Sequence, residues 1–350
     1  MTTEPLHERI AVLAHGRFPD DARAAIALVR YGRPEVVAVI DTARRSPLAS
    51  QLVRTLPKIP IVRRFDDVDE PVDALYVGID LARDGTTADL TEPVRRDVRA
   101  ALAAGRDVVV SRAGFPVDDP EFARLTADGD GRIVDVGAPP ADRTDGAGRA
   151  DAVDATVLLT VGTDRYVGAS STAFELVRAA RERGLDAALV PTSHVGALLE
   201  GRGVTLDRVP TGRAHGVVDG LVRDRSERHE LLVVEGQGAL CHPGSSGQIC
   251  GLLHAARPNG LVLCHSAGRE LTHGFDVDLP PVPAQVDLYE RLAAPVSEAT
   301  VLAGALNTMN VATPPEAREA VADFAELLGA PATDPVRFDA DALLEAVDLG

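Results

Sequence analysis

One short segment has the residue types and spacing of a phosphate-binding loop. An apolar run, ATVLLT, is followed by VGTDRYVGASST at residues 161–172 and then by the helix-like AFELVRAARERG. A strand, a glycine turn and a helix N-terminus together present backbone N–H groups and the positive end of a helix dipole to an anion. The residues expected to contact a bound phosphate are Gly162, Thr163, Asp164, Gly168, Ser170, Ser171 and Thr172.

The loop departs from the usual pattern where its lysine should be. Gly162 and Gly168 bracket five residues, one more than in the common pattern, and Ala169 stands at the lysine position. That lysine is the charge that reaches the β and γ phosphates in nucleotide hydrolysis. We therefore expect a loop that holds a pyrophosphate without supporting fast phosphoryl transfer. The alternative is a plain glycine turn capped by serines.

A second segment, LLVVEGQGALCHPGSSG, places two proton-transfer groups near a strand end. Four apolar residues predict a strand that delivers Glu235 at its carboxyl end, and Gly236 and Gly238 allow a tight turn before His242. Ligands of open parallel sheets bind outside the carboxyl ends of the strands. We expect Glu235 and His242 to share a crevice with the phosphate loop, each as a candidate catalytic residue.

A third segment, LVLCHSAGR, repeats this design. It predicts a strand that ends at Cys264, with His265, Ser266 and Arg269 on the following loop. His265 is a further candidate catalytic residue. The alternatives are that Cys264 is a small buried apolar residue and His265 a hydrogen-bonded turn residue.

The pairs Cys241-His242 and Cys264-His265 also raise the question of a metal site. Structural zinc sites space their paired ligands by two to four residues, and adjacent side chains at a strand end point apart. We expect no metal.

The distribution of strands and helices predicts two domains. RIAVLAH, EVVAVID, ALYVGID, DVVVS and RIVDVG are strand candidates that alternate with helical segments, and the alternation resumes after a Pro-, Gly- and Asp-rich stretch at residues 137–155. Strands alternating with helices predict doubly wound α/β domains with parallel sheets. We expect a Rossmann-like domain at 1–142 and a domain like that of phosphate-loop NTPases at 153–350.

The first domain has the strand, helix and strand of a dinucleotide-binding unit without its glycine fingerprint. Gly16 is alone in the first turn, so nicotinamide binding is weakly supported. Asp41, at the end of the second strand, is expected to be a cap or turn residue.

Composition excludes several classes of function. The net charge is −17 with acidic residues spread along the chain and no basic stripe, which argues against nucleic-acid binding. No apolar run approaches the roughly 20 residues of a membrane span, and the N-terminus lacks a signal peptide, so we expect a cytoplasmic protein without membrane contact. Lys58 is the only lysine, and this composition resembles that of haloarchaeal proteins. The alternative explanation for Ala169 is that a chain generally depleted of lysine has lost the loop lysine as well.

The motifs together resemble a known family. GTD…VG…ST, VEGQGAL.HP, GLLH…P..LVLCH.AGR and TDPVRF are similar to those of the domain of unknown function 1611 family, which includes D-glutamate N-acetyltransferases. The resemblance implies a Rossmann-like domain joined to a phosphate-loop domain. It further implies acetyl-coenzyme A as co-substrate, an acidic amino acid such as D-glutamate as acceptor in D-amino acid catabolism, no tightly bound cofactor, and a homo-oligomer.

The chain differs from the family pattern at three places. Ala169 replaces the loop lysine, His194 stands where a glutamine is usual, and Gly212 stands where a second acidic residue is expected. His194 and Arg269 are the expected substrate-binding residues. For Arg269 the reason is that a guanidinium pairs readily with a substrate carboxylate.

Three functions follow as alternatives. In an acetyl-coenzyme A dependent N-acetyltransferase, one of the candidate catalytic residues takes the proton from the acceptor's ammonium. An ATP-dependent ligase similar to dethiobiotin synthetase is disfavoured by Ala169, since that more distant relative keeps the lysine. A non-catalytic or redirected paralogue would bind only a nucleotide or coenzyme.

Overall fold

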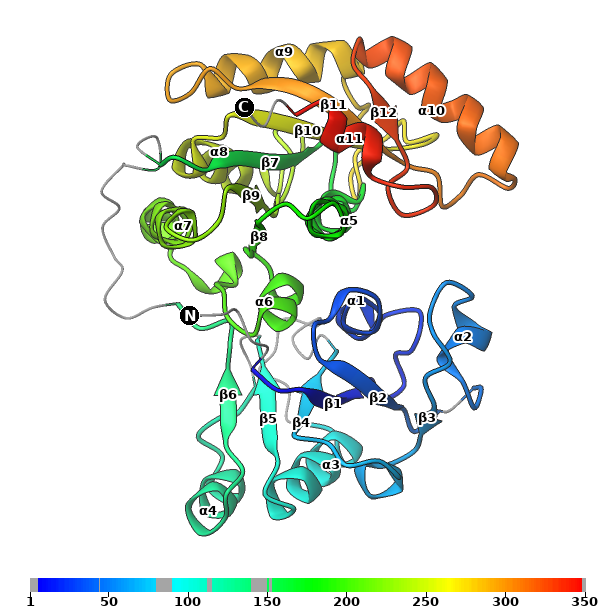
Figure 1. The fold of residues 1–350 in the computed structure, drawn as a ribbon, viewed down its shortest axis with the longest axis vertical. Helices are drawn as coiled ribbons and strands as arrows, with labels where there is room; N and C mark the ends of the chain where they lie inside the picture. The colour runs from blue at the N-terminus through cyan, green and yellow to red at the C-terminus, as the bar shows by residue number, and fades with distance from the viewer. Residues whose placement is uncertain are drawn as a thin grey trace. The chain divides into compact units, whose positions relative to one another are not determined.

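The chain folds into two compact units. A computed structural model describes residues 6–43, 45–79, 90–111, 115–139, 150 and 153–347. The first unit comprises Met1–Pro139 and Ser193–Arg208, and the second comprises Pro140–Thr192 and Val209–Gly350 (Figure 1).

The described residues of the first unit contain a six-stranded parallel sheet with the order β3-β2-β1-β4-β5-β6. Its strands are β1 (Arg9–Leu13), β2 (Glu35–Ile40), β3 (Ile61–Val62), β4 (Ala74–Val77), β5 (Asp107–Val110) and β6 (Ile133–Asp135). Its helices are α1 (Arg23–Tyr31), α2 (Ala49–Leu52), α3 (Glu92–Ala103), α4 (Pro120–Asp128) and α6 (His194–Glu200), with 3-10 turns at Phe65–Asp67 and Leu206–Arg208.

This architecture confirms the predicted Rossmann-like fold. The strand order is that of dinucleotide-binding domains, and Figure 1 shows α1 and α3 on opposite faces of the sheet. Strands covered on both faces read as continuous apolar runs, and Ile10–Leu13 and Val36–Ile40 are buried throughout. Asp41 is a turn residue as expected, since its Oδ1 accepts hydrogen bonds from the backbone N–H groups of Gly16 and Ala43.

The domain ranges expected from the sequence differ from the observed units at one segment. Ser193–Arg208 packs with the first unit although its neighbours in the chain belong to the second. The Thr205 hydroxyl donates to the Ser111 carbonyl at 2.8 Å, and the Arg208 guanidinium forms two 2.7 Å contacts with the Asp135 carboxylate. These contacts join residues far apart in the chain, so periodicity cannot reveal them. The expected junction at 142–153 lies outside the described residues except for Ala150 and Val153.

The described residues of the second unit also contain a six-stranded parallel sheet, in the order β12-β11-β10-β7-β9-β8. Its strands are β7 (Thr156–Gly162), β8 (Ala187–Val190), β9 (Leu231–Val234), β10 (Gly260–Ser266), β11 (Thr300–Asn307) and β12 (Ala332–Thr333). Its helices are α5 (Ala169–Glu182), α7 (Thr211–Ser226), α8 (Ser246–Ala256), α9 (Val282–Ala293), α10 (Pro314–Leu328) and α11 (Asp341–Glu345). In the described part of the chain, no helix combines the length and apolar composition needed to cross a membrane.

The order of this sheet marks a place for a ligand. The chain passes from β7 through β8 and β9 on one side and then through β10 and β11 on the other. Ligands of doubly wound sheets bind at the carboxyl ends of the strands where the order reverses. Here that place is the end of β7, between β9 and β10.

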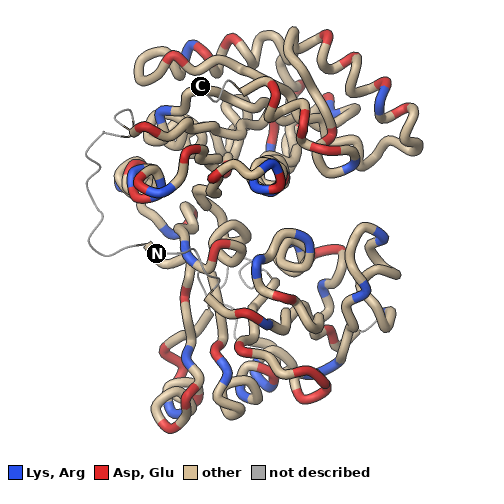
Figure 2. The backbone as a smooth tube through the Cα atoms, viewed as in Figure 1, with Lys and Arg blue, Asp and Glu red and all other residues tan. Residues whose placement is uncertain are grey.

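Charges are mixed over both units. Figure 2 shows Lys and Arg interspersed with Asp and Glu along the backbone of each unit. An anionic ligand must therefore be attracted by a local cation or by backbone N–H groups.

The closing motif TDPVRF fixes the loop that follows β11. Asp334 Oδ2 accepts from the Thr308 backbone N–H at 2.9 Å and from its hydroxyl at 2.6 Å, while Asp334 Oδ1 accepts from the N–H groups of Val336 and Arg337. The Arg337 guanidinium donates to the carbonyls of Thr308 and Val311. This motif of the sequence thus has a structural role.

Asp334→Ala should lower the free energy of unfolding by about 2–4 kcal/mol, because it leaves the buried N–H and hydroxyl of Thr308 without this acceptor. The denaturant midpoint of the two proteins measures this loss. Asp287→Ala, which removes an exposed ion pair to Arg291 in the same unit, is the control and should cost less than about 0.5 kcal/mol. Equal shifts for the two variants would contradict the assigned role.

Candidate functional site

The loop after β7 has the predicted strand, turn and helix. Helix α5 begins at Ala169, and Gly168 caps it with a φ of 111°, in the region that favours glycine. A Cβ atom at Gly162 would lie 2.7 Å from the Asp164 carbonyl oxygen, so a side chain is excluded there. At Gly168 a Cβ would approach only the Asn307 side chain within 4 Å, which leaves open space beside the helix N-terminus. This geometry suits an anion.

The end of β7 is held from both neighbouring strands. Gly236 N–H donates to the Thr160 hydroxyl at 2.9 Å, and a Cβ at Gly236 would lie 1.7 Å from the Thr160 carbonyl oxygen. On the other side Gly162 pairs with Cys264 of β10. The three strand ends therefore lie level, and Gly162 and Gly236 allow the close approach.

Tyr289 of α9 also holds the end of β7 through its hydroxyl group. Its buried hydroxyl donates to the Gly162 carbonyl at 2.7 Å and accepts from the Leu240 N–H at 3.3 Å. Burial raises the pKa of this phenol well above its usual value, so it remains a donor. Its role is not evident from the sequence, where Tyr289 is one apolar position of an amphipathic helix.

A short hairpin follows β10 and lies over the loop. Residues 270–279 form it, with a bridge between Leu271 and Asp278 and a hydrogen bond from Leu279 N–H to the Glu270 carbonyl. Both backbone groups of His273, at its tip, are held: the N–H donates to Asp164 Oδ2 at 2.8 Å, and the carbonyl accepts from His242 Nε2 at 3.1 Å. The loop and the segment after β9 thus anchor the hairpin together.

His242 has both ring nitrogens occupied. Besides the contact to His273, its Nδ1 accepts from the Gly244 N–H at 3.0 Å, which fixes the neutral tautomer with the proton on Nε2. The ring is buried and lies edge-on to Phe275. This is the geometry of a loop anchor, and a catalytic role for His242, which stays a prediction, requires it to release one of these partners.

Glu235 is buried directly after β9. Its Oε2 accepts from the Thr192 backbone N–H at 3.1 Å, and its carbonyl accepts from the Thr192 hydroxyl at 2.6 Å. None of the three candidate catalytic residues, Glu235, His242 and His265, is among the residues that line the cavity described below. The catalytic role of Glu235 also stays a prediction.

His265 lies on a strand instead of the expected loop. Strand β10 continues to Ser266, two residues beyond the predicted end at Cys264, because it pairs with β11 as far as Asn307. The His265 ring stacks on Phe324, and its Nδ1 lies 2.8 Å from the Thr163 hydroxyl. Among the described residues, nothing is bonded to its Nε2.

The environment of His265 favours the neutral imidazole. Burial lowers the pKa of this ring below its usual value, the Arg269 guanidinium lowers it further, and Asp164 opposes the shift with a smaller effect. A neutral imidazole with one nitrogen unoccupied is able to accept a proton near neutral pH.

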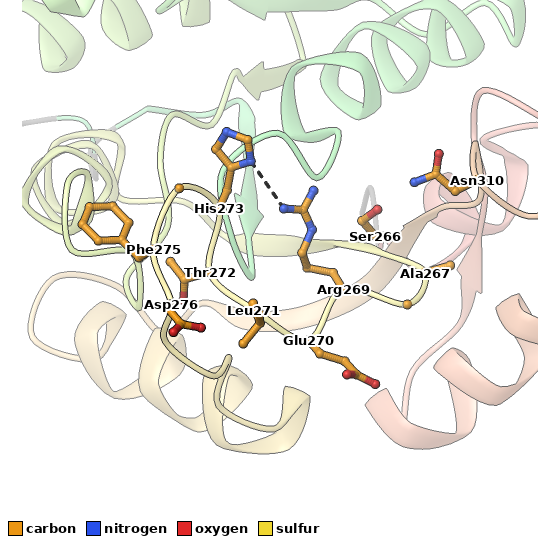
Figure 3. Close-up of a pocket in the computed structure, with 12 residues that line it drawn as sticks. Ser266, Ala267, Arg269, Glu270, Leu271, Thr272, His273, Phe275, Asp276 and Asn310 are labelled. Atoms are coloured by element: carbon orange, nitrogen blue, oxygen red, sulfur yellow. Dashed lines mark hydrogen bonds between the residues drawn. The ribbon is translucent and has the colours of Figure 1, made fainter.

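An open cavity of about 700 Å³ lies at the ends of β10 and β11. Figure 3 shows its lining, which runs from Ser266 to Asp276 and includes Asn310. Arg269 lines it and lies 3.4 Å from Asp164 Oδ2. Because Asp164 contacts both Arg269 and the tip of the 270–279 hairpin, the cavity adjoins the glycine loop.

The remaining predicted residues are distributed as follows. Thr163 and Thr172 are buried, whereas Ser170 and Ser171 are half-buried in the first turn of α5. His194 is the first residue of α6 and belongs to the first unit, where α6 packs on α1.

No metal site is formed by the described residues, where no group of three or more His, Cys, Asp and Glu side chains is arranged to hold an ion. All three cysteines are free. Burial raises the pKa of the Cys264 thiol to about 12. Cys264 is therefore a protonated, buried residue.

Comparison with known proteins gives consistent matches. A model described as a domain of unknown function (DUF1611_C) P-loop domain matches residues 144–344, and one described as a DUF1611_N Rossmann-like domain matches residues 48–139. A crystal structure of a DUF1611 family protein from Anabaena variabilis superposes with a TM-score of 0.86 at 32% identity, over 97% of this chain and 98% of that one.

Two curated relatives carry the name D-glutamate N-acetyltransferase. The protein from Pseudoalteromonas sp is 32% identical over 189 residues, which span 53% of this chain and 56% of the relative. The protein from Tritonibacter scottomollicae is 32% identical over 257 residues, which span 71% of this chain and 74% of the relative. The match to the first of them therefore covers little more than half of its length.

The lowered pKa of His265 predicts a pH dependence of stability. Above the unfolded-state pKa of about 6.5 the ring is neutral in both states and has no effect. As the pH falls through this value toward the lower folded-state pKa, the unfolded chain binds the proton first, so the native state loses stability. His265→Gln should lose less stability than the unmodified protein between pH 8 and pH 5, as measured by urea midpoints. All other ionisable groups are the same in the two proteins, so parallel pH profiles would contradict the shift.

Proposed function

Because the chain belongs to the DUF1611 family, we propose that it is an N-acetyltransferase that moves an acetyl group from acetyl-coenzyme A to the amine of an acidic amino acid. The names of the two curated relatives support D-glutamate as the acceptor, with a role in D-amino acid catabolism. The single structural observation behind this proposal is a glycine loop and helix N-terminus suited to phosphates, with Ala169 in place of the lysine.

The loop supports binding more than phosphoryl transfer. Acyl transfer from a coenzyme needs its phosphates to be held, whereas nucleotide hydrolysis needs a charge that stabilises the transferred group. A loop with backbone donors and no lysine meets the first requirement and lacks the usual means for the second. This disfavours an ATP-dependent ligase.

His265 is the base that the geometry favours among the three candidates. Its Nε2 is unoccupied within the described residues, whereas Glu235 and His242 are engaged with backbone groups. In the proposed reaction the imidazole takes one proton from the acceptor's ammonium. The amine nitrogen then bonds to the thioester carbon, the carbon–sulfur bond breaks, and the thiolate leaves and takes up the second proton of the nitrogen.

The activity itself is tested by thiol release from acetyl-coenzyme A in the presence of D-glutamate, L-glutamate or no acceptor. We expect release with D-glutamate. His265→Ala should lower turnover by about 100-fold or more while acetyl-coenzyme A binding is kept. His229→Ala is the matched control, since His229 precedes β9 and lies at the amino ends of the parallel strands, away from the carboxyl ends that carry the site.

Other outcomes would change the assignment. Wild-type turnover in His265→Ala together with a large loss in Glu235→Gln would make Glu235 the base. Coenzyme binding without acetyl transfer to any acidic amino acid would indicate a redirected or non-catalytic paralogue.

The phosphate loop is tested by Gly168→Val, which should abolish acetyl-coenzyme A binding. A β-branched side chain resists a φ of 111° and would occupy the open space beside the helix N-terminus. Gly184→Val is the matched control, because Gly184 follows the same helix with a φ of 81° and has nothing near its Cβ position. Calorimetric titration compares the two, and unchanged affinity in Gly168→Val would reduce the loop to a turn.

A further inference from the structure

The glycine loop has no lysine to neutralise a bound pyrophosphate. Ala169 occupies that position, and the only lysine of the chain, Lys58, belongs to the first unit. The net charge is −17, and Figure 2 shows Lys and Arg interspersed with Asp and Glu along the described backbone of both units. Any cation that serves the loop must come from its immediate surroundings.

Arg269 is placed beside the loop by the register of the sheet. Cys264 of β10 lies opposite Gly162 of β7, so the chain beyond Ser266 runs alongside the residues that follow Gly162. The Arg269 Nη1 atom lies 3.4 Å from Asp164 Oδ2 within the loop and 3.5 Å from His273 Nδ1. These two contacts hold the guanidinium at the border between the loop and the cavity.

The guanidinium keeps donors for a ligand. Its Nε and Nη2 have no acceptor among the described residues, and the side chain is 27% exposed. Figure 3 shows the guanidinium pointing toward His273, while the Glu270 side chain extends away from it. A guanidinium with two adjacent unoccupied nitrogens matches the oxygens of a phosphate in a bidentate manner.

Arg165 is the competing cation, since it lies on the loop itself. Its guanidinium stands over the Tyr166 ring, 5.1 Å from the centroid, and its Nη2 lies 3.3 Å from the Tyr166 hydroxyl. Both residues are exposed. Arg165 is therefore committed to the outer surface of the loop, without the buried carboxylate that fixes Arg269.

We propose that Arg269 replaces the missing loop lysine and binds the pyrophosphate group of a coenzyme or nucleotide. This rests on the proposed function only in taking coenzyme A as the first ligand to test. It also assigns to Arg269 a different anion from the substrate carboxylate expected from the sequence.

Calorimetric titration of the full chain with inorganic pyrophosphate, coenzyme A and ADP at one fixed salt concentration tests the proposal. Arg269→Ala should weaken pyrophosphate binding by about 10- to 100-fold, the loss expected for charge-assisted hydrogen bonds. Coenzyme A losing affinity in parallel identifies it as the source of the pyrophosphate, and a parallel loss for ADP alone identifies a nucleotide. Arg291→Ala, which removes an exposed charge on α9, controls for the change in net charge.

A gain of function provides the second arm. Ala169→Lys in the Arg269→Ala background should recover about tenfold in pyrophosphate affinity, because it restores the cation at the usual position. Absence of any recovery overturns the replacement. So does wild-type affinity in Arg269→Ala, a larger loss in Arg165→Ala than in Arg269→Ala, or absence of pyrophosphate binding by the unmodified protein.

Acetyl-transfer kinetics separate this inference from the proposed function. If the protein binds pyrophosphate through Arg269 but transfers no acetyl group, the proposed acetyltransferase function is wrong and the proposed role of Arg269 is supported. Active enzyme in which Arg269→Ala raises the KM for the amino acid, with the KM for acetyl-coenzyme A unchanged, would keep the function and overturn the inference.

Discussion

A buried carboxylate within the glycine loop holds the candidate site together. The Asp164 side chain has no exposed surface, and its Oδ2 accepts from the His273 N–H and faces the Arg269 guanidinium. A carboxylate removed from water needs such partners. Its Oδ1 has no partner among the described residues, so the compensation depends on the two groups at Oδ2. The loop, the hairpin tip and the guanidinium are consequently fixed by the Asp164 side chain. Moving the hairpin tip or the guanidinium would leave this buried carboxylate with fewer partners, which is unfavourable.

That constraint works because the sheet end beneath it is rigid. A side chain at Gly162 would meet the Asp164 carbonyl and one at Gly236 the Thr160 carbonyl, and Tyr289 ties the Gly162 carbonyl to the segment after β9. His242 completes the arrangement by holding the hairpin from the β9 side. Backbone groups and glycines therefore fix the loop that carries Asp164, and Asp164 fixes the Arg269 guanidinium, whose other nitrogens can face a ligand.

What could be predicted from the sequence was local. Apolar runs and glycines placed β7, β9 and β10, the turn at Gly168 and the start of α5, because each depends on residues adjacent in the chain. The roles of Tyr289, His273 and Asp334 depend on partners 26 to 127 residues away in the chain. The periodicity of apolar residues gives no information on such distant contacts. The same limit explains why 193–208 was expected in the second domain. His265 was expected on a loop because Cys264 ends the apolar run, whereas pairing with β11 extends the strand through polar residues.

The loss of the loop lysine is easier to reconcile with acyl transfer than with nucleotide chemistry. In phosphoryl transfer the lysine stabilises charge that develops during the reaction, so its removal acts on the transition state. In transfer from a coenzyme thioester the phosphates do not react, and their binding energy serves to position a distant acyl group. A cation that follows β10 and is fixed by a buried carboxylate of the loop after β7 suits this second task, since it has only to hold a group whose charge does not change. In the proposed acetyltransferase, the combination of Ala169 with an anchored Arg269 would retain the coenzyme and leave its phosphates intact.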